Sequence, residues 1–206
     1  AGSWGTLAVL TQVTFKVLPA AETEQTLVLR GFDDAQAAAA MALAMGSNAE
    51  LSSAAHLPVT VSSKVIGGAL SGEAATLLRI EGFPKSVAYR IEKLAKFLSA
   101  KSEILAEAQS RALWREIRDC LPFADGSEKP VWRVSAAPMS GHAVVADLRL
   151  HAAADAFYDW QGGLVWISLE GDPEADALRA IIKKHGGGHA TLIRTSEEQR
   201  RTISAF

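Results

Sequence analysis

The side chains best suited to chemistry in this sequence are arginines, and Arg133 is the leading candidate. A guanidinium group is a planar fork that matches the two oxygens of a carboxylate. Arg133 lies between Trp132 and Val134 on a predicted apolar strand, where an inward-facing arginine would need a charged partner. The alternative is that strand alternation points Arg133 to solvent. Weaker candidates are Arg115 and Arg118, predicted on the solvated face of a helix, and Arg194.

The five histidines suggest no metal site. His185 and His189 are four residues apart, which is the spacing of metal ligands on a helix, but three glycines between them interrupt any helix. We therefore interpret them as a helix end and a strand start. His142 is predicted at the surface start of a helix, or at an interface, and no partner is evident for His56 or His151.

The sequence contains a single cysteine, Cys120, which cannot form an internal disulfide. A reducing compartment is the simplest interpretation, so we expect a cytoplasmic protein. Cys120 stands at the end of a predicted amphipathic helix, where a small buried side chain is the expected role. No cysteine cluster, paired-histidine motif or G-x-S-x-G turn occurs, so hydrolase and metalloenzyme functions lack support.

The composition is that of a globular chain. Its 206 residues are 49% hydrophobic and 21% charged, enough for one domain or two small ones in close contact. The formal net charge of −2 leaves no basic excess for phosphates, which argues against nucleic acid as a partner. No apolar run is long enough for a transmembrane segment. The first residues show no signal peptide and resemble the middle of a longer protein.

Two similar units must position these side chains. A strand at 6–18 comes first, with Val13, Phe15 and Val17 on one side of it. In the first unit, Asp33 and Asp34 are placed to cap a helix. That unit is predicted to contain strands at 25–30, 50–53 with an extension at 58–62, 75–81 and 102–105, and helices at 35–45 and 86–98.

A separate helix is predicted at 108–119, followed by the second unit. Its strands are expected at 131–135, 157–159, 164–169 and 189–194, and its helices at 138–150 and 174–184, the latter behind a cap at Asp172 and Pro173. Gln161-Gly162-Gly163 is predicted as a hairpin turn. Each unit reads β-α-β-β-α-β, the ferredoxin-like pattern. We predict an α+β fold with one mainly antiparallel sheet and helices on one face.

The most specific motif is Gly2-Ser3-Trp4-Gly5-Thr6-Leu7, which runs on through Lys16-Val17-Leu18-Pro19. It resembles the end of the FAD-binding domain in FAD-linked oxidases of the vanillyl-alcohol-oxidase type, where a G-[ST]-x-G-[TI]-[LI] turn leads into a strand. The resemblance implies that residues 1–19 end an FAD-binding domain. It also implies that backbone of Gly2, Ser3, Gly5 and Thr6 contacts FAD. The alternative is an ordinary glycine-bounded turn before a strand.

Three segments of the second unit, 131–135, 159–166 and 187–194, are similar to the FAD-binding subunit of glycolate oxidase. The resemblance implies that residues 20–206 form a cap, or substrate, domain for a small 2-hydroxy acid, with Arg133 holding the carboxylate. It implies FAD as the cofactor. It also implies two partners in one complex, a larger flavin subunit and an iron–sulfur subunit.

The sequence departs from this family in two ways. Catalytic relatives carry an H-x-G-D-G-N-x-H strand, whereas residues 158–166 contain no histidine, so no catalytic base is assigned. Neither the preceding flavin domain nor the family's tail is in the sequence, so we expect the isolated chain to be inactive and to bind FAD weakly or not at all.

Two kinds of function remain open. The first is the cap of an FAD-dependent 2-hydroxy-acid (glycolate) oxidoreductase subunit. The alternative is a non-catalytic ferredoxin-like module for subunit assembly or small-molecule binding. The tryptophans could stack on a flavin or fill an interface, but core packing is the preferred interpretation for Trp4, Trp114, Trp132, Trp160 and Trp166.

Overall fold

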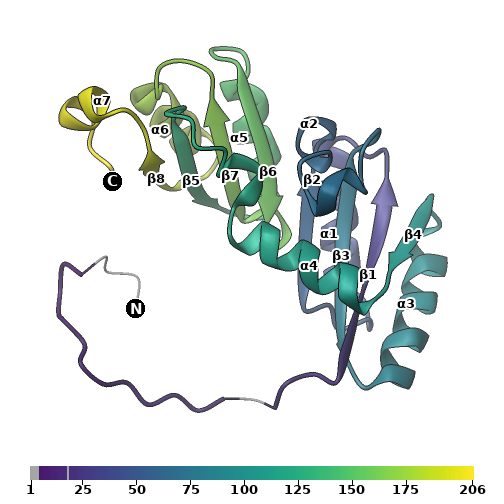
Figure 1. Ribbon diagram of the computed structural model, residues 1–206. Helices are drawn as coiled ribbons and strands as arrows, with labels where there is room; N and C mark the ends of the chain where they lie inside the picture. The colour runs from purple at the N-terminus through teal and green to yellow at the C-terminus, as the bar shows by residue number, and fades with distance from the viewer. Residues whose placement is uncertain (1–4, 18) are drawn as a thin grey trace.

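Eight antiparallel strands form one continuous sheet in the computed structural model, which describes residues 5–17 and 19–206 (Figure 1). Their order across the sheet is β4-β1-β3-β2-β6-β7-β5-β8. The strands are β1 (Thr23–Arg30), β2 (Ser53–Leu57), β3 (Ala75–Gly82), β4 (Ser102–Leu105), β5 (Val131–Ala136), β6 (Ala154–Asp159), β7 (Leu164–Leu169) and β8 (Gly188–Arg194).

Seven α-helices and three short 3₁₀ turns connect these strands within the described residues. The helices are α1 (Asp34–Met45), α2 (Val59–Ser62), α3 (Pro84–Leu98), α4 (Glu107–Arg118), α5 (Gly141–Leu148), α6 (Ala175–Lys184) and α7 (Glu197–Thr202). The 3₁₀ turns are η1 (Ile66–Gly68), η2 (Leu121–Phe123) and η3 (Trp160–Gly162). None of the helices that the structure describes has the length and apolar run needed to cross a membrane.

The sheet is built from two copies of the predicted β-α-β-β-α-β unit. The first unit runs from β1 to β4 and the second from β5 to β8, and their strand orders mirror each other across the β2–β6 boundary. There the two edge strands pair antiparallel, with His56 opposite Tyr158. The predicted α+β class with two ferredoxin-like units in one antiparallel sheet is confirmed.

The main helices of the two units, α1, α3, α5 and α6, lie on one face of the sheet, as predicted, whereas α4 and the short α2 pack on the other (Figure 1). In the first unit, Leu29 and Leu78 pack with Met41 of α1 and Ile91 of α3. Alternate residues of the same strands, such as Leu77, point to the opposite face and pack with residues of α4. Since strand side chains alternate, the first unit is buried on both faces.

The second unit is covered by helices on one face only. Trp132 and Ile167 point to that face and pack against Val144 of α5 and Leu178 of α6. On the opposite face, Phe123 of η2 packs against Val131 and Phe157, but no α-helix that the structure describes covers β5, β7 and β8 (Figure 1). This face, which carries Arg133, Ser135, Trp166, His189 and Thr191, is called the open face below.

Local sequence signals explain most element boundaries, but four expectations were wrong. Asp33 forms the capping box of α1 with Gln36, as its position predicted. The strand predicted at 50–53 with an extension at 58–62 lies instead at Ser53–Leu57, and the extension is the short helix α2. Helix α7 was missed. Glu174, with a positive φ of 50°, stands at the N-cap of α6 in place of Asp172 and Pro173.

The fourth correction concerns the predicted strand at 6–18. Residues 6–17 form no strand, and their apolar side chains, including Leu7, Val9 and Phe15, are exposed. A strand requires a neighbouring strand to pair its backbone groups, which alternation in the sequence does not supply. Leu18 lies outside the described residues.

The carboxylate of Asp34 joins the two units beside the β2–β6 boundary. It accepts hydrogen bonds from Tyr158 Oη at 2.6 Å and from an Arg149 Nη at 3.0 Å, both in the second unit. On its other side, Nε2 of the fully buried His56 lies 3.3 Å away, poorly aligned for a hydrogen bond. His56 Nδ1 lies 2.9 Å from Thr76 Oγ1. One acidic side chain therefore connects α1, β2, β6 and the end of α5.

This arrangement fixes the protonation states of Asp34 and Tyr158. Burial opposes ionisation of Asp34, but the contacts with His56 and Tyr158 and the charge of Arg149 outweigh it and lower its pKa from 3.8 to about 2. Burial, followed by the negative charge of Asp34, raises the pKa of Tyr158. The phenol therefore stays protonated and donates to a charged carboxylate at neutral pH.

We predict that Asp34→Asn lowers the free energy of unfolding at pH 7 by about 2 kcal/mol, the equivalent of the lowered pKa. A carboxyl with a lowered pKa stabilises the fold above its unfolded-state pKa. That contribution disappears as the pH falls from about 4 to about 2. Urea titrations of both proteins at pH 7 and pH 2 should show a gap that closes in acid. Asp176→Asn, at an exposed position of α6, is the control. A gap of equal size at both pH values would contradict the prediction.

Candidate functional site

Helix α4 packs firmly against the first unit, so the backbone that carries its outward-facing side chains has a fixed position. Leu113, Trp114 and Ile117 are buried against the sheet. Glu116 accepts a hydrogen bond at 2.6 Å from the backbone N–H of Ile66 in η1. At the start of the helix, Glu107 accepts one at 2.9 Å from Thr23.

A directed chain of buried hydrogen bonds lies beneath α4. Trp114 Nε1 donates to Thr26 Oγ1 at 2.8 Å, and Ser110 Oγ donates to Glu24 Oε1 at 2.7 Å. Thr26 and Ser110 are 2.8 Å apart, and since the proton of Ser110 goes to Glu24, Thr26 must donate to Ser110. The chain ends on a carboxylate that Arg79 also contacts at 2.6 Å. The buried charge of Glu24 is therefore paired and hydrogen-bonded.

A strained turn of the second unit, η3, faces α4 across the β2–β6 boundary. Trp160 and Gln161 have φ angles of 49° and 63°, and Gly162 follows at 90°. Two consecutive non-glycine residues in the left-handed region cost free energy, so surrounding contacts must hold them. Asp159 Oδ1 accepts from Trp160 N at 2.7 Å, and η3 packs against β2 and α1.

Gly162 explains why this turn cannot relax. A Cβ atom at Gly162 would lie 2.6 Å from the carbonyl oxygen of Pro138, and one at Gly141 would lie 2.4 Å from the carbonyl oxygen of Gly162. The start of α5 and the turn therefore approach each other as closely as backbone allows. The predicted hairpin turn at Gln161-Gly162-Gly163 is confirmed as the connection between β6 and β7.

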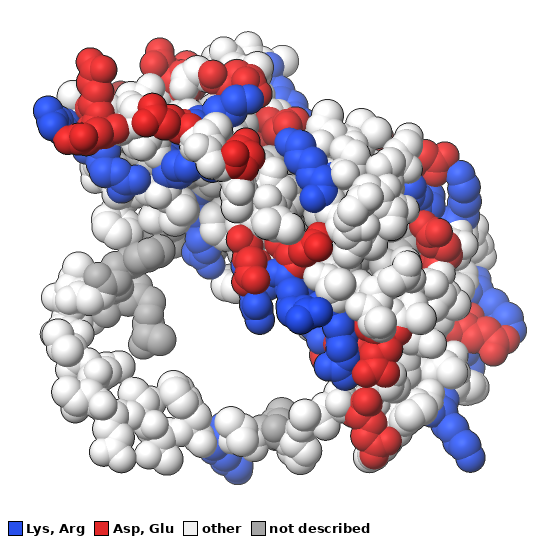
Figure 2. Space-filling model, viewed as in Figure 1, with Lys and Arg blue, Asp and Glu red and all other residues white. Residues whose placement is uncertain are grey.

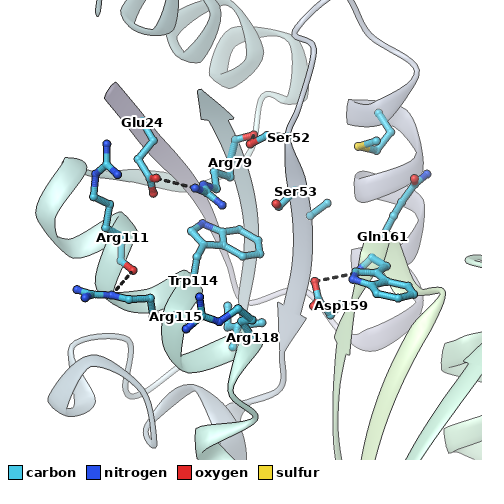
Figure 3. Close-up of a pocket in the computed structure, with 14 residues that line it drawn as sticks. Glu24, Ser52, Ser53, Arg79, Arg111, Trp114, Arg115, Arg118, Asp159 and Gln161 are labelled. Atoms are coloured by element: carbon cyan, nitrogen blue, oxygen red, sulfur yellow. Dashed lines mark hydrogen bonds and ion pairs between the residues drawn. The ribbon is translucent and has the colours of Figure 1, made fainter. Parts of the chain in front are cut away.

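Together, α4 and η3 enclose a cleft of about 720 Å³, called the α4 cleft below (Figure 3). Four arginines line it, Arg79 from β3 and Arg111, Arg115 and Arg118 from one face of α4. Basic and acidic side chains gather along α4 in Figure 2. The remaining lining residues are Glu24, Met45, Ser52, Ser53, Ala54, Trp114, Ile117, Asp159, Trp160 and Gln161.

Asp159 is the one lining carboxylate contributed by the second unit. Burial raises its pKa, against the opposing effect of the hydrogen bond from Trp160 N. Its carboxylate gives the η3 side of the cleft an acidic group opposite the arginines of α4 (Figure 3). The cleft therefore has a basic wall and a weakly acidic one, and its centre lies where the two units meet.

The open face adjoins the α4 cleft through Trp160. The guanidinium carbon of Arg133 lies 5.3 Å from the centre of the Trp160 ring, within reach of a cation–π contact. Arg133 is half-buried and makes no ion pair with any residue that the structure describes. Pairing of β5 with β8 sets Arg133 opposite Thr191 and Ser135 opposite His189. Arg133 is thus neither in the core nor fully in solvent.

The other candidates have structural roles or lie apart. Arg194 binds the carbonyl oxygens of Phe123 and Lys129 at 2.6 and 2.9 Å, which fixes a loop. His185 lies at the end of α6, where its Nε2 is 2.8 Å from Asp147, and is not paired with His189. Among the described residues, no group of three His, Cys, Asp or Glu side chains is arranged to hold a metal ion.

The predicted FAD-contacting turn is described only in part. Gly2 and Ser3 lie outside the described residues. Gly5 has a φ of 79° with open space where a Cβ would stand, and Thr6 is exposed. Gly5 therefore has the backbone geometry that only glycine adopts readily.

Three of the tryptophans lie in or against the core, as expected, and sequence reasoning missed the roles of His56 and Asp159. Trp132 and Trp114 are buried, and Trp166 packs against Phe157. Trp160 is 61% exposed, against the expectation of core packing, because it sits on the η3 turn. Trp4 lies outside the described residues. The roles of His56 and Asp159 depend on contacts between units, which local patterns do not reveal.

Comparisons with known proteins identify the fold alone. No family model matches the sequence, and no curated protein does either. Among solved structures, p-cresol methylhydroxylase with substrate bound matches at a TM-score of 0.54 and 13% identity over 87% of this chain. The isoeugenol complex of 4-ethylphenol oxidase from Gulosibacter chungangensis matches at 0.50 and 12% over 86%. This chain covers 46% of each of those chains. The α+β fold predicted from the sequence is therefore shared with these two structures over most of this chain.

We predict that Gly162→Ala destabilises the protein by about 1–3 kcal/mol more than Gly186→Ala. Both glycines have strongly positive φ angles, 90° and 100°, but only at Gly162 would the added Cβ meet a backbone oxygen. The comparison therefore separates steric overlap from backbone strain. Urea unfolding monitored by circular dichroism measures both changes, and equal losses would contradict the tight packing of η3.

We also predict that Cys120 reacts slowly in the folded protein. Burial raises the pKa of its thiol to about 12, although the charge of Arg194 opposes the shift. At pH 8 only about one thiol in ten thousand would be ionised, so alkylation by iodoacetamide should be at least about 100-fold slower than in urea. Mass spectrometry measures both rates, with Cys120→Ser as the blank. Equal rates in the two states would contradict the prediction.

Proposed function

We propose that this chain is the substrate-side cap of an FAD-linked oxidoreductase that acts on a small 2-hydroxy acid such as glycolate. One observation carries the proposal. Arg133 has no ion-pair partner among the described residues, and it lies on a sheet face that no described α-helix covers. The fold supports it, since the two solved structures that share it, p-cresol methylhydroxylase and 4-ethylphenol oxidase, are oxidoreductases by name.

Arg133 is suited to holding the substrate carboxylate. Its side chain lies over Trp160, whose ring fixes one face of the guanidinium and leaves the edge of the fork available. An anion arriving at this edge would meet a charge that no described carboxylate neutralises. Trp166, opposite Arg133 on β7, adds apolar surface beside it. The arrangement favours a small organic acid over a free inorganic ion.

The open face also offers a candidate to take the hydroxyl proton. His189 lies opposite Ser135 on β8, one diagonal step from Arg133, and such neighbours are about 7–8 Å apart. Both side chains project from the same face of the sheet, so a two-carbon hydroxy acid whose carboxylate rests on Arg133 would have its hydroxyl on the side of the imidazole. His189 is exposed and belongs to a segment in which the family resemblance assigned no base.

FAD, when bound, would accept the hydride from the substrate carbon. The described residues fit the substrate side of such a site, since the open face supplies a cation and aromatic surface. Gly5 and Thr6 have the exposed turn geometry that a flavin-contacting backbone requires. We place FAD in a flavin-binding domain against the open face, and we propose a larger flavin subunit and an iron–sulfur subunit as partners.

A second function is favoured by the apolar segment at 6–17. Leu7, Val9 and Phe15 are 85%, 90% and 77% exposed, and Figure 2 shows that the segment carries almost no charge. Exposed apolar stretches of this kind mark contact surfaces. The chain would then be a non-catalytic module whose role is to hold subunits together.

We predict that Arg133→Ala lowers glycolate-dependent dye reduction at least about 100-fold in the complex with the flavin and iron–sulfur subunits, mainly through a higher KM. The loss follows from removal of the charge that holds the carboxylate. Arg201→Ala, at an exposed position of α7, is the matched control. A pull-down with the flavin subunit checks that assembly is intact.

The same experiment distinguishes the two functions. If Arg133→Ala leaves activity unchanged while the complex assembles normally, the substrate role is wrong and the assembly module remains. The purified chain alone should retain little FAD on gel filtration and should not reduce dye with glycolate. Robust turnover by the chain alone would contradict a cap that depends on a separate flavin domain.

A further inference from the structure

The α4 cleft contains a second arginine that makes no ion pair with any residue of the described chain, although its charge contributes to the lowered pKa of Asp119. Arg111 is paired with Glu107 at 2.9 Å and Arg118 with Asp119 at 2.8 Å, both on or next to the same helix. Arg115, between them, donates only to the carbonyl oxygen of Arg111 at 3.2 Å. No carboxylate among the described residues lies within ion-pair distance of it.

Arg115 is not the only lining group with free hydrogen-bonding capacity. Ser53, on the floor of the cleft, makes no side-chain hydrogen bond with any residue of the described chain, and neither does the amide of Gln161. Figure 3 shows that the three come from different elements, α4, β2 and η3, around one space. Polar groups from separate elements that converge on a cleft are typical of a ligand site.

We infer that the α4 cleft binds an aromatic monocarboxylate, with the carboxylate on Arg115. The guanidinium fork suits a carboxylate, and the exposed side chains of Met45 and Trp160 supply apolar surface for a ring, with the edge of Trp114 beside them. A dianion is disfavoured because Asp159 and Glu24 line the same space. The volume of about 720 Å³ far exceeds that of a two-carbon acid and falls in the range of small-molecule pockets.

This site is separate from the one proposed around Arg133. Arg133 does not line the α4 cleft, and Trp160 lies between the two. The inference requires neither FAD nor a partner subunit, so it stands or fails independently of the oxidoreductase function. The α4 cleft also depends on a helix that covers the sheet face opposite α1 and α3, and the second unit has no described α-helix on that face.

The test is titration of the purified 206-residue chain with benzoate, followed by isothermal calorimetry and by the NMR shifts of the indole N–H groups. We expect saturable binding to one site, with shifts at Trp114 and Trp160 and little change at Trp132, which is buried in the other core. Benzamide, which has the same ring without the charge, and inorganic phosphate, which has charge without a ring, should each bind at least about tenfold more weakly.

Arg115→Gln should weaken benzoate binding at least about tenfold, because the carboxylate loses its charged partner. Arg115 is exposed, so this variant should fold normally, and its urea midpoint checks that it does. Arg201→Gln removes the same charge from exposed α7 and should bind like the wild type. The inference is overturned if Arg115→Gln binds benzoate as tightly as the wild type. Equal binding of benzamide or phosphate would also overturn it.

Discussion

The two halves of the fold meet around one buried carboxylate, that of Asp34, which contacts Tyr158, Arg149 and His56. Backbone pairing between β2 and β6 is short, with His56 opposite Tyr158, so side chains must supply much of the attachment. A carboxylate that meets a phenol, a guanidinium and an imidazole is sensitive to position, because hydrogen bonds weaken steeply with poor alignment. Asp34 therefore sets the register of one unit against the other.

The α4 cleft is a consequence of that register. Its basic wall belongs to the first unit and to α4, whereas Asp159, Trp160 and Gln161 belong to the second. The η3 turn is held in a strained conformation between α1, β2 and the start of α5, so a shift of the second unit would move it directly. The same turn carries the ring that Arg133 faces on the open side. Both candidate sites therefore depend on the position of η3, which is set by contacts across the boundary between the two units.

Much of the fold could be predicted from the sequence, and the failures have a common cause. Helix α1 was predicted from its cap at Asp33, and the apolar segments at 75–81 and 164–169 were predicted as the strands that form β3 and β7. Asp34 was predicted only as a capping residue, and no partner was found for His56. Their roles depend on residues more than 100 positions away or in another strand, which periodicity does not encode. The strand predicted at 6–18 failed for the same reason, since alternation describes a strand's faces but not its neighbour.

The two units differ because the segment that connects them forms one helix, α4, which covers the first unit alone. On the first unit α4 places Trp114 over the sheet, and the hydrogen bonds from Trp114 to Glu24 satisfy polar groups that would be costly if buried unpaired. The second unit has no described counterpart of α4, and its corresponding face carries Arg133, Thr191 and His189 instead of a buried chain. Since the underlying strand order is the same, the fold does not require that face to be open. The residues on the open face are those of a surface that meets a ligand or another domain. Because only one unit is covered by α4, the two repeated units carry chemically different sites.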